Sequence, residues 1–482
     1  MTSSEPLASL RPEALLTVVA ELQHQMAEQQ RQIAELTARN AALQMEIARL
    51  TRSVKRQAAP FSKGQRVATP KRPGRKPGSG RFCYRAAPLP AQLTAPPVEV
   101  PVTLDSCPAC GGALVAERID LAYTTDIPAL PRPPVTQYRV SVCRCMVCGK
   151  QVRGQHPDVA PDQYGATAHR VGDRVLAAAH GLHYGVGIPV RKVPRVLEAL
   201  TGVTLTQGAI TQDAMRRATD VVGAVYEDLR TAIPAAPVVH TDDTSWRVGG
   251  EPAYLMAFET DVATVYQVRS QHRHAEVQEV IPCDYEGVMV TDRGRSYDAQ
   301  AFDDVKQQKC LAPILRSIQT VLQTKKGRAR AVGERLKALL QDALQLWRGY
   351  HAGDVADFAA QVQCLRAAIT HHLRNRCLTD PDNQRLLNQI GRHHDRGNLL
   401  RFLEDPHIEP TNNRAERALR PAVIARKVSQ CSKNAPGAHA FAAFTSVVRT
   451  LAQQGVASMV EGLYQLFRSA QAHAAPPLPL SN

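Results

Sequence analysis

The sequence of 482 residues has no long hydrophobic run, few aromatic residues and few cysteines for its length. Without about 18 consecutive apolar residues, or a basic N-terminal segment followed by an apolar one, we expect no membrane span, no secretory leader and a cytoplasmic protein. Aromatic residues make up 5%, while Ala, Leu, Gln and Arg recur, which favours a helix-rich fold. Eleven irregularly spaced cysteines suit metal binding better than a disulfide scaffold.

Negative charge is also scarce in this chain. It carries 59 Lys and Arg against 44 Asp and Glu, a formal net charge of +15, which indicates a polyanionic partner. A chain of this length is too long for one ordinary core and implies roughly two to four folded units. We therefore expect a multidomain, α-rich protein, and four regions with different patterns follow one another along it.

The first region, residues 10–54, has a seven-residue hydrophobic repeat. Leucines recur between Leu15 and Leu50 on one seam position, and Val, Met and Ile occupy the other. Asn40 falls on the same seam, where a buried asparagine fixes the register of two parallel helices. The repeat predicts a coiled coil that makes the protein a dimer or larger. A surface helix packed on its own domain is the alternative.

The second region, residues 55–100, is predicted to be a disordered basic linker. Its first part is rich in Lys and Arg, contains no Asp or Glu, and is broken by Pro and Gly. Arg72, Arg75 and Lys76 are candidates for contacts with DNA phosphates or the minor groove. A solvated tether is an equally good interpretation.

The third region, residues 101–155, contains two C-x2-C pairs, each followed by glycine. Cys107 and Cys110 form the first pair, and Cys145 and Cys148 form the second. Four thiolates in two such pairs match the ligand set of a tetrahedral Zn²⁺ site. Cys143 is an alternative ligand, and four unrelated cysteines are the competing interpretation.

Residues 160–232 read as helices with a helix-turn-helix-like turn at Gly202, after which Thr206 begins the second helix. Arg216 and Arg217 on that second helix are candidates for contacts in a DNA groove, although an ordinary helical hairpin has the same pattern. His180 and His183 lie one turn apart without a carboxylate near them in sequence. We interpret them as ordinary polar positions.

The fourth region, residues 235–475, is predicted to be an α/β core. Three strand-like segments, a short helix and a fourth strand follow one another, which is the order of a ribonuclease-H-like fold. In that fold the first and fourth strands are neighbours, so Asp242 and Asp292 would lie side by side. Two close carboxylates repel unless a divalent ion neutralises them, which makes both candidate Mg²⁺ ligands. Asp243 points to the opposite face of a regular strand and is secondary.

A third acid is expected from a later helix. Glu416 lies in the first turn of a helix capped by Asn412 or Asn413, and Arg420 follows one turn later, where it can contact a phosphate. A surface Glu–Arg pair is the alternative. The acids at positions 404, 405 and 409 compete by position only. A helical insertion is predicted over about residues 311–406, and we interpret the paired histidines at 371–372 and 393–394 as surface residues.

Together these motifs resemble the transposases of the insertion sequence 66 family. The resemblance rests on "CPACGG" and "CMVCGK", on "HTDDTSW" and "VTDRGRSYDA", and on "PTNNRAERALRP" with "GAHAFAAFTSVVRTLAQQG". It implies a leucine-zipper-like helix, a basic linker and a zinc-binding domain before a DDE core. It also implies Asp242, Asp292 and Glu416 as the catalytic triad that binds Mg²⁺ or Mn²⁺, and a bacterial, nucleoid-associated protein.

The resemblance implies DNA cleavage and strand transfer at the terminal inverted repeats of a mobile element, with target DNA as the second substrate. Whether accessory proteins take part is open. One motif departs from the family, because Pro313 stands after Cys310 where a histidine is expected. Two further hypotheses remain: a DNA-binding regulator with an inactive core, and a structure-specific nuclease on the same fold.

Overall fold

The computed structural model describes residues 12–54, 88–89, 96, 98–103, 105–115, 118–124, 133–374 and 377–471. These residues belong to two compact units. One unit takes its residues from 1–62, 138–195 and 204–482, and the other from 63–137 and 196–203. In the part of the chain that the structure describes, no helix is long and apolar enough to cross a membrane. The DNA-binding candidates Arg72, Arg75 and Lys76 lie outside the described residues.

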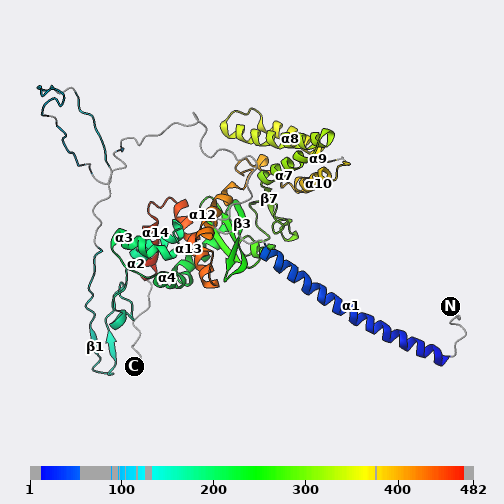
Figure 1. The fold of residues 1–482 in the computed structure, drawn as a ribbon, viewed down its shortest axis with the longest axis horizontal. Helices are drawn as coiled ribbons and strands as arrows, with labels where there is room; N and C mark the ends of the chain where they lie inside the picture. The colour runs from blue at the N-terminus through cyan, green and yellow to red at the C-terminus, as the bar shows by residue number, and fades with distance from the viewer. Residues whose placement is uncertain are drawn as a thin grey trace. The chain divides into compact units, whose positions relative to one another are not determined.

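The N-terminal repeat forms one long helix, α1 (Pro12–Val54), drawn in blue in Figure 1. This confirms that the repeat is helical, close to the predicted bounds. Several seam residues are exposed on the single chain, and each of Leu22, Ile33 and Leu36 has more than half of its surface accessible. Pairing with a second copy stays a prediction, because one chain does not test it.

Among the described residues between α1 and the central sheet are two short strands and four α-helices. The predicted turn and cap are present: Gly202 has a φ of +72°, and the Thr206 hydroxyl accepts a hydrogen bond of 3.1 Å from the backbone N–H of Ala209. The strands are β1 (Val142–Arg144) and β2 (Gln151–Arg153), and the helices are α2 (Asp173–His180), α3 (Val193–Thr201), α4 (Gln207–Thr219) and α5 (Val221–Ala232).

A mixed five-stranded sheet forms the centre of the larger unit, in the order β5-β4-β3-β6-β7. The first and fourth predicted strands are parallel neighbours, as the order of segments predicts. The edge strand β7 was not predicted, because its residues KQQK show no apolar period. The elements are β3 (Val238–Val248), β4 (Glu251–Glu259), β5 (Thr264–Arg269), α6 (His274–Gln278), β6 (Val288–Thr291) and β7 (Lys306–Lys309).

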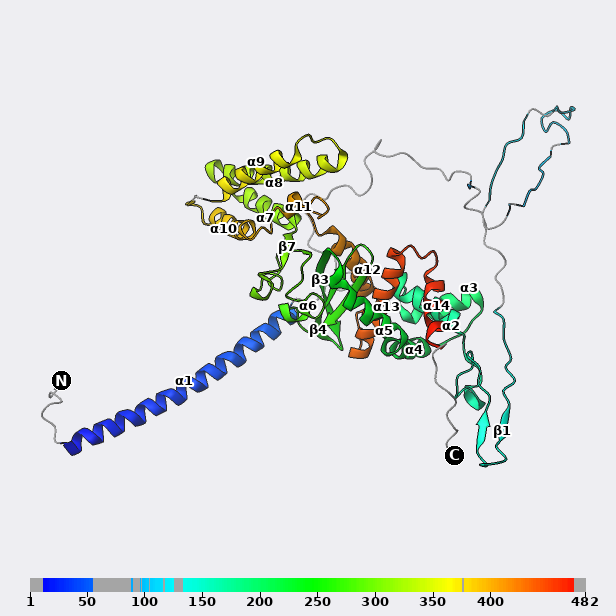
Figure 2. The same cartoon turned by 180° about the vertical axis from the view of Figure 1, so that it is seen from behind.

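The two faces of the sheet bury separate hydrophobic cores, because successive strand residues point to opposite faces. In β6, Met289 contributes to one core, while Val288 and Val290 contribute to the other. Over the first face, α12 packs on β3 and β4, and α13 packs on β5, as Figures 1 and 2 show. These C-terminal helices are α12 (Asn413–Ser429), α13 (Ala435–Gln453) and α14 (Met459–Gln471).

The second core includes the helical insertion, which forms a helical layer in both views (Figures 1 and 2). The predicted helical character of this region is therefore found. One detail is corrected: His372 is buried and its Nε2 lies 3.0 Å from the carbonyl oxygen of Val332, whereas the neighbouring His371 is exposed. The helices are α7 (Leu311–Thr324), α8 (Gly327–Ala352), α9 (Phe358–Leu373), α10 (Pro381–Asp395) and α11 (Arg401–Glu404).

Candidate active site

Asp242 and Asp292 occupy matching positions on the two central parallel strands. The last paired residues are His240 and Val290, and each acid lies two residues beyond them. Asp242 is within β3, whereas Asp292 directly follows β6. One oxygen of each carboxylate accepts a backbone N–H: Asp242 Oδ1 from Asp243 at 2.9 Å, and Asp292 Oδ1 from Gly294 at 2.7 Å. These bonds fix the carboxylates and leave the second oxygen of each for a ligand.

Glu416 enters the same region from the first turn of α12. The position of that turn is fixed by Asn412, whose side-chain amide donates to the carbonyl of Thr241 at 2.7 Å and whose backbone N–H lies 3.1 Å from Cys310 Sγ. Asn412 occupies the N-cap position, but its side chain does not cap the helix as predicted. The amide instead ties the start of α12 to the residue before Asp242.

The alternative role of Glu416 as half of a surface pair is not observed. Glu416 and Arg420 are both exposed, and they form no ion pair with each other or with another side chain of the described chain. Both side chains are therefore available to a ligand from outside the protein.

Asp242 lies in an unfavourable electrostatic environment. Burial is the main cause that raises its pKa to about 7, and the charges of Asp292, Asp243 and Glu416 raise it further, against the hydrogen bond from the Asp243 N–H. No Lys or Arg of the described residues forms an ion pair with Asp242. A half-buried carboxylate that lies near other carboxylates and has no ion-pair partner suits a cation from solution.

The donor chemistry of this cluster fits a divalent metal ion, although the side chains do not already form a ligand set. Carboxylate oxygens are the ligands that Mg²⁺ and Mn²⁺ prefer. Among the described residues, however, no group of three or more His, Cys, Asp or Glu is arranged to hold a metal ion. The three acids are thus neighbours that fit the ion in charge and donor type.

Asp243, which the sequence ranked below Asp242 as a candidate Mg²⁺ ligand, has a side-chain partner of its own. Its Oδ1 lies 3.1 Å from Nδ1 of His272, a side chain with 9% of its surface exposed. The other ring nitrogen of His272 has no hydrogen-bond partner among the described residues. Asp243 therefore borders the acid cluster but is held by a histidine that precedes α6.

Lys309 is a charged residue beside the site that the sequence analysis missed. It lies opposite Thr291 in the β6–β7 pair and is fully buried. Its ammonium group donates to Asp298 Oδ1 at 2.7 Å and to Thr291 Oγ1 at 3.1 Å. Thr291 and Asp298 lie before and after Asp292 in the chain. Lys309 therefore holds the segment that contains Asp292 against the sheet. The only sequence signal was a lysine in a short polar segment.

Pro313, the departure from the family motif, lies in the first turn of α7. Proline is tolerated there because the first backbone N–H groups of a helix have no helical acceptor. Its carbonyl oxygen accepts from Arg293 at 3.4 Å, and the same guanidinium group donates to Ser317 Oγ at 2.6 Å. The motif position thus contacts the residue that follows Asp292.

The two arginines predicted to contact a DNA groove have different surroundings. Arg216 is largely exposed and pairs with Asp213 at 2.6 Å. Arg217 is buried, pairs with Asp213 and Asp173, and lies over the ring of Phe467, so it belongs to the interior and not to a DNA-binding surface.

His180 is not the ordinary polar position that its local sequence suggested. It is fully buried, and its Nε2 lies 2.8 Å from Asp213 Oδ2. A carboxylate 33 residues away in sequence is thus its direct partner, although the local sequence showed none.

The two cysteine pairs share one backbone geometry, although they lie in different units. Gly111 and Gly149 have φ values of +72° and +69°, and each donates its N–H to the carbonyl of the first cysteine of its pair. Backbone N–H groups near the sulfurs lower the pKa of Cys107 and Cys145. Each pair is therefore a tight turn that favours thiolates.

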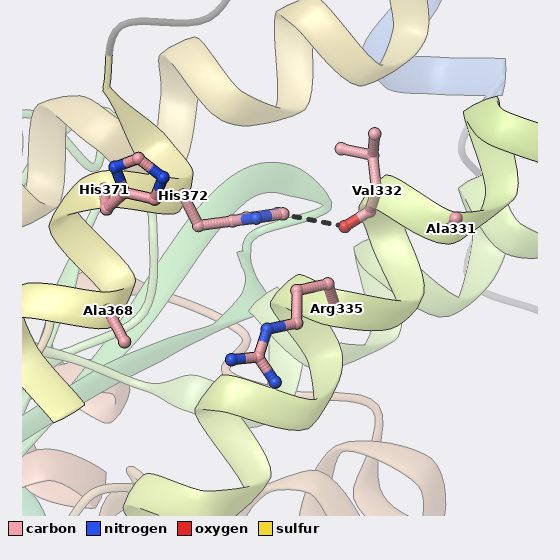
Figure 3. Close-up of a pocket in the computed structure, with 6 residues that line it drawn as sticks. All are labelled: Ala331, Val332, Arg335, Ala368, His371 and His372. Carbon is pink, nitrogen blue, oxygen red and sulfur yellow. Dashed lines mark hydrogen bonds between the residues drawn. The ribbon is translucent and has the colours of Figure 1, made fainter.

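A cavity of about 270 Å³ lies between α8 and α9, and Figure 3 shows its lining. Arg335 and His371 are its polar contributors besides the hydrogen-bonded His372, and no carboxylate lines it. The cavity lining therefore differs from the acid cluster, because it offers no carboxylate ligands for a hard cation.

A central mixed sheet with carboxylates gathered beside its two middle strands is an arrangement that can support metal-dependent phosphoryl transfer. The model of the Transposase IS66 family matches residues 169–440, which is more than half of the chain. The protein therefore belongs to this transposase family, which supports a transposase role and implies DNA binding and a divalent metal cofactor. No curated protein is similar enough to count as a match.

Proposed function

We propose that the protein is a DDE transposase with a ribonuclease-H-like core spanning residues 235–475. It would bind the ends of a mobile element, hydrolyse DNA phosphodiesters there and transfer the freed strand to target DNA. The observation that carries the proposal is the half-buried Asp242 carboxyl, whose pKa is raised to about 7 by desolvation and by the nearby charges of Asp292 and Glu416. Family membership and the adjacency of β3 and β6 support it further.

In this proposal Asp242, Asp292 and Glu416 hold Mg²⁺ or Mn²⁺. Bound divalent ions supply activation of the attacking oxygen and stabilisation of the leaving oxygen in an in-line displacement. The backbone bonds to Asp242 and Asp292 orient both carboxylates before DNA arrives. Asn412 fixes Glu416 relative to β3, and Arg420 is free to contact a phosphate.

The reaction then needs two displacements at phosphorus and no covalent enzyme intermediate. In the first, a water oxygen attacks the phosphodiester at the element's end, and the 3′ oxygen leaves and gains a proton. In the second, that 3′-hydroxyl attacks a target phosphodiester, loses its proton and displaces the target's own 3′ oxygen. One set of acids can serve both steps because the reacting groups are alike.

The test is Mg²⁺- or Mn²⁺-dependent cleavage of duplex DNA that carries the flanks of the encoding element. Asp242→Asn, Asp292→Asn and Glu416→Gln each keep the size of the side chain but remove a charge that holds a cation, so each should reduce cleavage to background. DNA binding should survive. Glu404→Gln is the matched control, because this acid is exposed and paired with Arg366 on the insertion.

The outcomes separate the competing functions. Cleavage by Asp242→Asn or Asp292→Asn at the wild-type rate would contradict the proposal. Element-end binding without any metal-dependent cleavage would indicate a DNA-binding regulator. Cleavage of branched DNA in preference to element ends would indicate a structure-specific nuclease.

In this proposal, the N-terminal regions bind DNA and join two copies of the chain. The linker (55–100), the zinc module (101–155) and the helical region (160–232) would hold the terminal inverted repeats, with Arg216 as an exposed contact. The coiled coil (10–54) would join two protomers so that both ends are cut together. Light scattering should show a smaller species when the residues before Arg52 are deleted, and an unchanged mass would contradict pairing.

Zinc binding by the cysteine pairs is part of the same proposal. Four thiolates, Cys107, Cys110, Cys145 and Cys148, should share one ion, so the purified chain should contain about one zinc per protein. Cys107→Ser and Cys145→Ser should each lose it. Loss with Cys143→Ser but not with Cys145→Ser would give the second pair a different ligand, and zinc-free wild-type protein would contradict the site.

A further inference from the structure

Helix α12 has one face fixed on the core and one face open to solvent. Small side chains on the packed face let the helix backbone approach the sheet closely, and α12 contacts both β3 and β4. Because the helix is anchored in this way, the direction of its exposed face relative to Asp242 is also fixed. The buried residues of the packed face are Ala415, Ala418, Leu419, Ala422 and Ala425.

The exposed face carries a row that we call the basic stripe: Arg417, Arg420, Ile424 and Lys427. Their spacings of three, four and three residues put them on one side of a helix, next to Glu416. All four are exposed, and Ile424 has 57% of its surface accessible. The stripe thus begins at the third acid and runs away from it along the helix.

The cations of the stripe differ from the other arginines of α12. Arg414 pairs with Asp261 at 2.5 Å, and Arg426 donates to Thr244 Oγ1 at 2.8 Å. Within the described residues, the three stripe cations form neither an ion pair nor a side-chain hydrogen bond. None of the three charges is taken up by an ion pair, and the stripe begins beside Glu416, the third acid of the candidate active site.

We propose that the basic stripe binds the phosphodiester backbone of the DNA strand that leads to Glu416. This inference rests on the proposed function and adds where the substrate lies. With a rise of about 1.5 Å per residue, Arg417 and Lys427 are separated by about 15 Å along the helix, close to the length of about four nucleotides at about 3.4 Å each.

Ile424 interrupts the cations with an exposed aliphatic side chain. In DNA complexes, apolar side chains contact base edges or insert between base steps beside the residues that bind the DNA. A second copy of the chain is a poorer occupant, because three unpaired positive charges would repel the same surface on a partner. Charge complementarity therefore favours DNA.

The experiment is equilibrium binding of a fluorescein-labelled 30-base-pair duplex over a series of salt concentrations in metal-free buffer. The slope of log K against log salt is negative, and Arg417→Gln, Arg420→Gln and Lys427→Gln combined should make it less negative by about 0.9 for each phosphate that the protein no longer neutralises. The magnitude of the slope should therefore be smaller in the triple variant than in the wild type by between about 2 and 3. Ile424→Ser should weaken binding while leaving the slope unchanged.

Arg385→Gln is the matched control, because Arg385 is exposed but already paired with Asp382, and it should keep the wild-type slope. Unchanged thermal unfolding of the triple variant verifies that the helix is intact.

A wild-type slope in the triple variant would overturn the stripe while leaving metal-dependent cleavage by the wild type untouched. If the wild type cleaves no DNA but its binding has the expected salt dependence, only the proposed chemistry is contradicted, and the stripe is not. A change of mass in light scattering with unchanged DNA binding would assign the face to a second copy and overturn the proposal.

Discussion

Two carboxylates in the same unit, buried Asp213 on α4 and half-buried Asp242 on β3, have opposite electrostatic surroundings. Burial alone raises the pKa of Asp213, but the hydrogen bond with His180 and the charge of Arg217 lower it to about 2. Burial also raises the pKa of Asp242, and neighbouring carboxylates raise it further, to about 7. The sign of the neighbouring charges therefore decides the outcome.

The difference separates a structural carboxylate from a candidate catalytic one. The Asp213 cluster is internally balanced, and its Arg217 also pairs with Asp173 and lies 3.8 Å above the ring of Phe467. Burial lowers the pKa of His180, which favours a neutral ring that donates its Nε2–H to ionised Asp213. Asp242 has no such cationic partner among the described residues, so its carboxylate suits a cation from solution.

The largest expected effect on stability comes from breaking the balanced cluster. Asp213→Asn should lower the free energy of unfolding by about 3–5 kcal/mol, because it leaves Arg217 buried with one acid instead of two. Since the folded pKa is below the ordinary value, the contribution of Asp213 is present above about pH 4 and is lost as the pH falls toward 2. Urea unfolding at several pH values measures both effects, and an unchanged stability would show that the cluster is not structural.

Asp242→Asn should have the opposite sign in metal-free buffer. The folded pKa of about 7 exceeds the ordinary value, so ionised Asp242 destabilises the fold increasingly as the pH rises from about 4 to 7. The substitution should therefore raise the free energy of unfolding by up to about 4 kcal/mol at pH 8, and the gain should shrink as the pH is lowered toward 4.

Added Mg²⁺ is the control for the predicted sign of this change in the free energy of unfolding. It should stabilise the wild type and leave Asp242→Asn nearly unchanged, since binding to the native state alone shifts unfolding. Destabilisation by Asp242→Asn at pH 8 would instead indicate a structural ion pair.

Lys309→Met should have an intermediate effect. It removes a buried ammonium group from Asp298, whose carboxylate is 33% exposed and can be partly rehydrated. We expect a loss of about 2–3 kcal/mol, below the range for a fully buried pair. Asp298→Asn in the same chain should recover part of the loss, and simple additivity of the two substitutions would exclude a direct charge pair.

Arg216→Gln should have the smallest effect. Its side chain is 62% exposed, and Asp213 keeps Arg217 and His180 as partners. The free energy of unfolding should change by less than about 1 kcal/mol, as for other exposed ion pairs. A loss as large as that of Asp213→Asn would show that Arg216, and not Arg217, supplies the balancing charge.

Local patterns in the sequence predicted a substantial part of this protein. The heptad repeat predicted α1, the cap at Thr206 predicted the start of α4, and the strand order predicted that β3 and β6 are neighbours. These predictions succeed because helix and strand periods, turns and caps depend on residues close in sequence. The choice of Asp242 and Asp292 followed from the same logic, since both acids come at the ends of apolar runs.

Tertiary structure alone decided which charges are balanced. Asp213 meets His180 from 33 residues away, Lys309 reaches Asp298 from an unpredicted strand, and Asn412 bonds to Thr241 across 171 residues. No local period encodes such contacts, because they depend on how separate elements pack and not on the spacing within one. The sequence by itself thus determined which acids the chain presents, and packing determined that Asp213 is compensated while Asp242 is not.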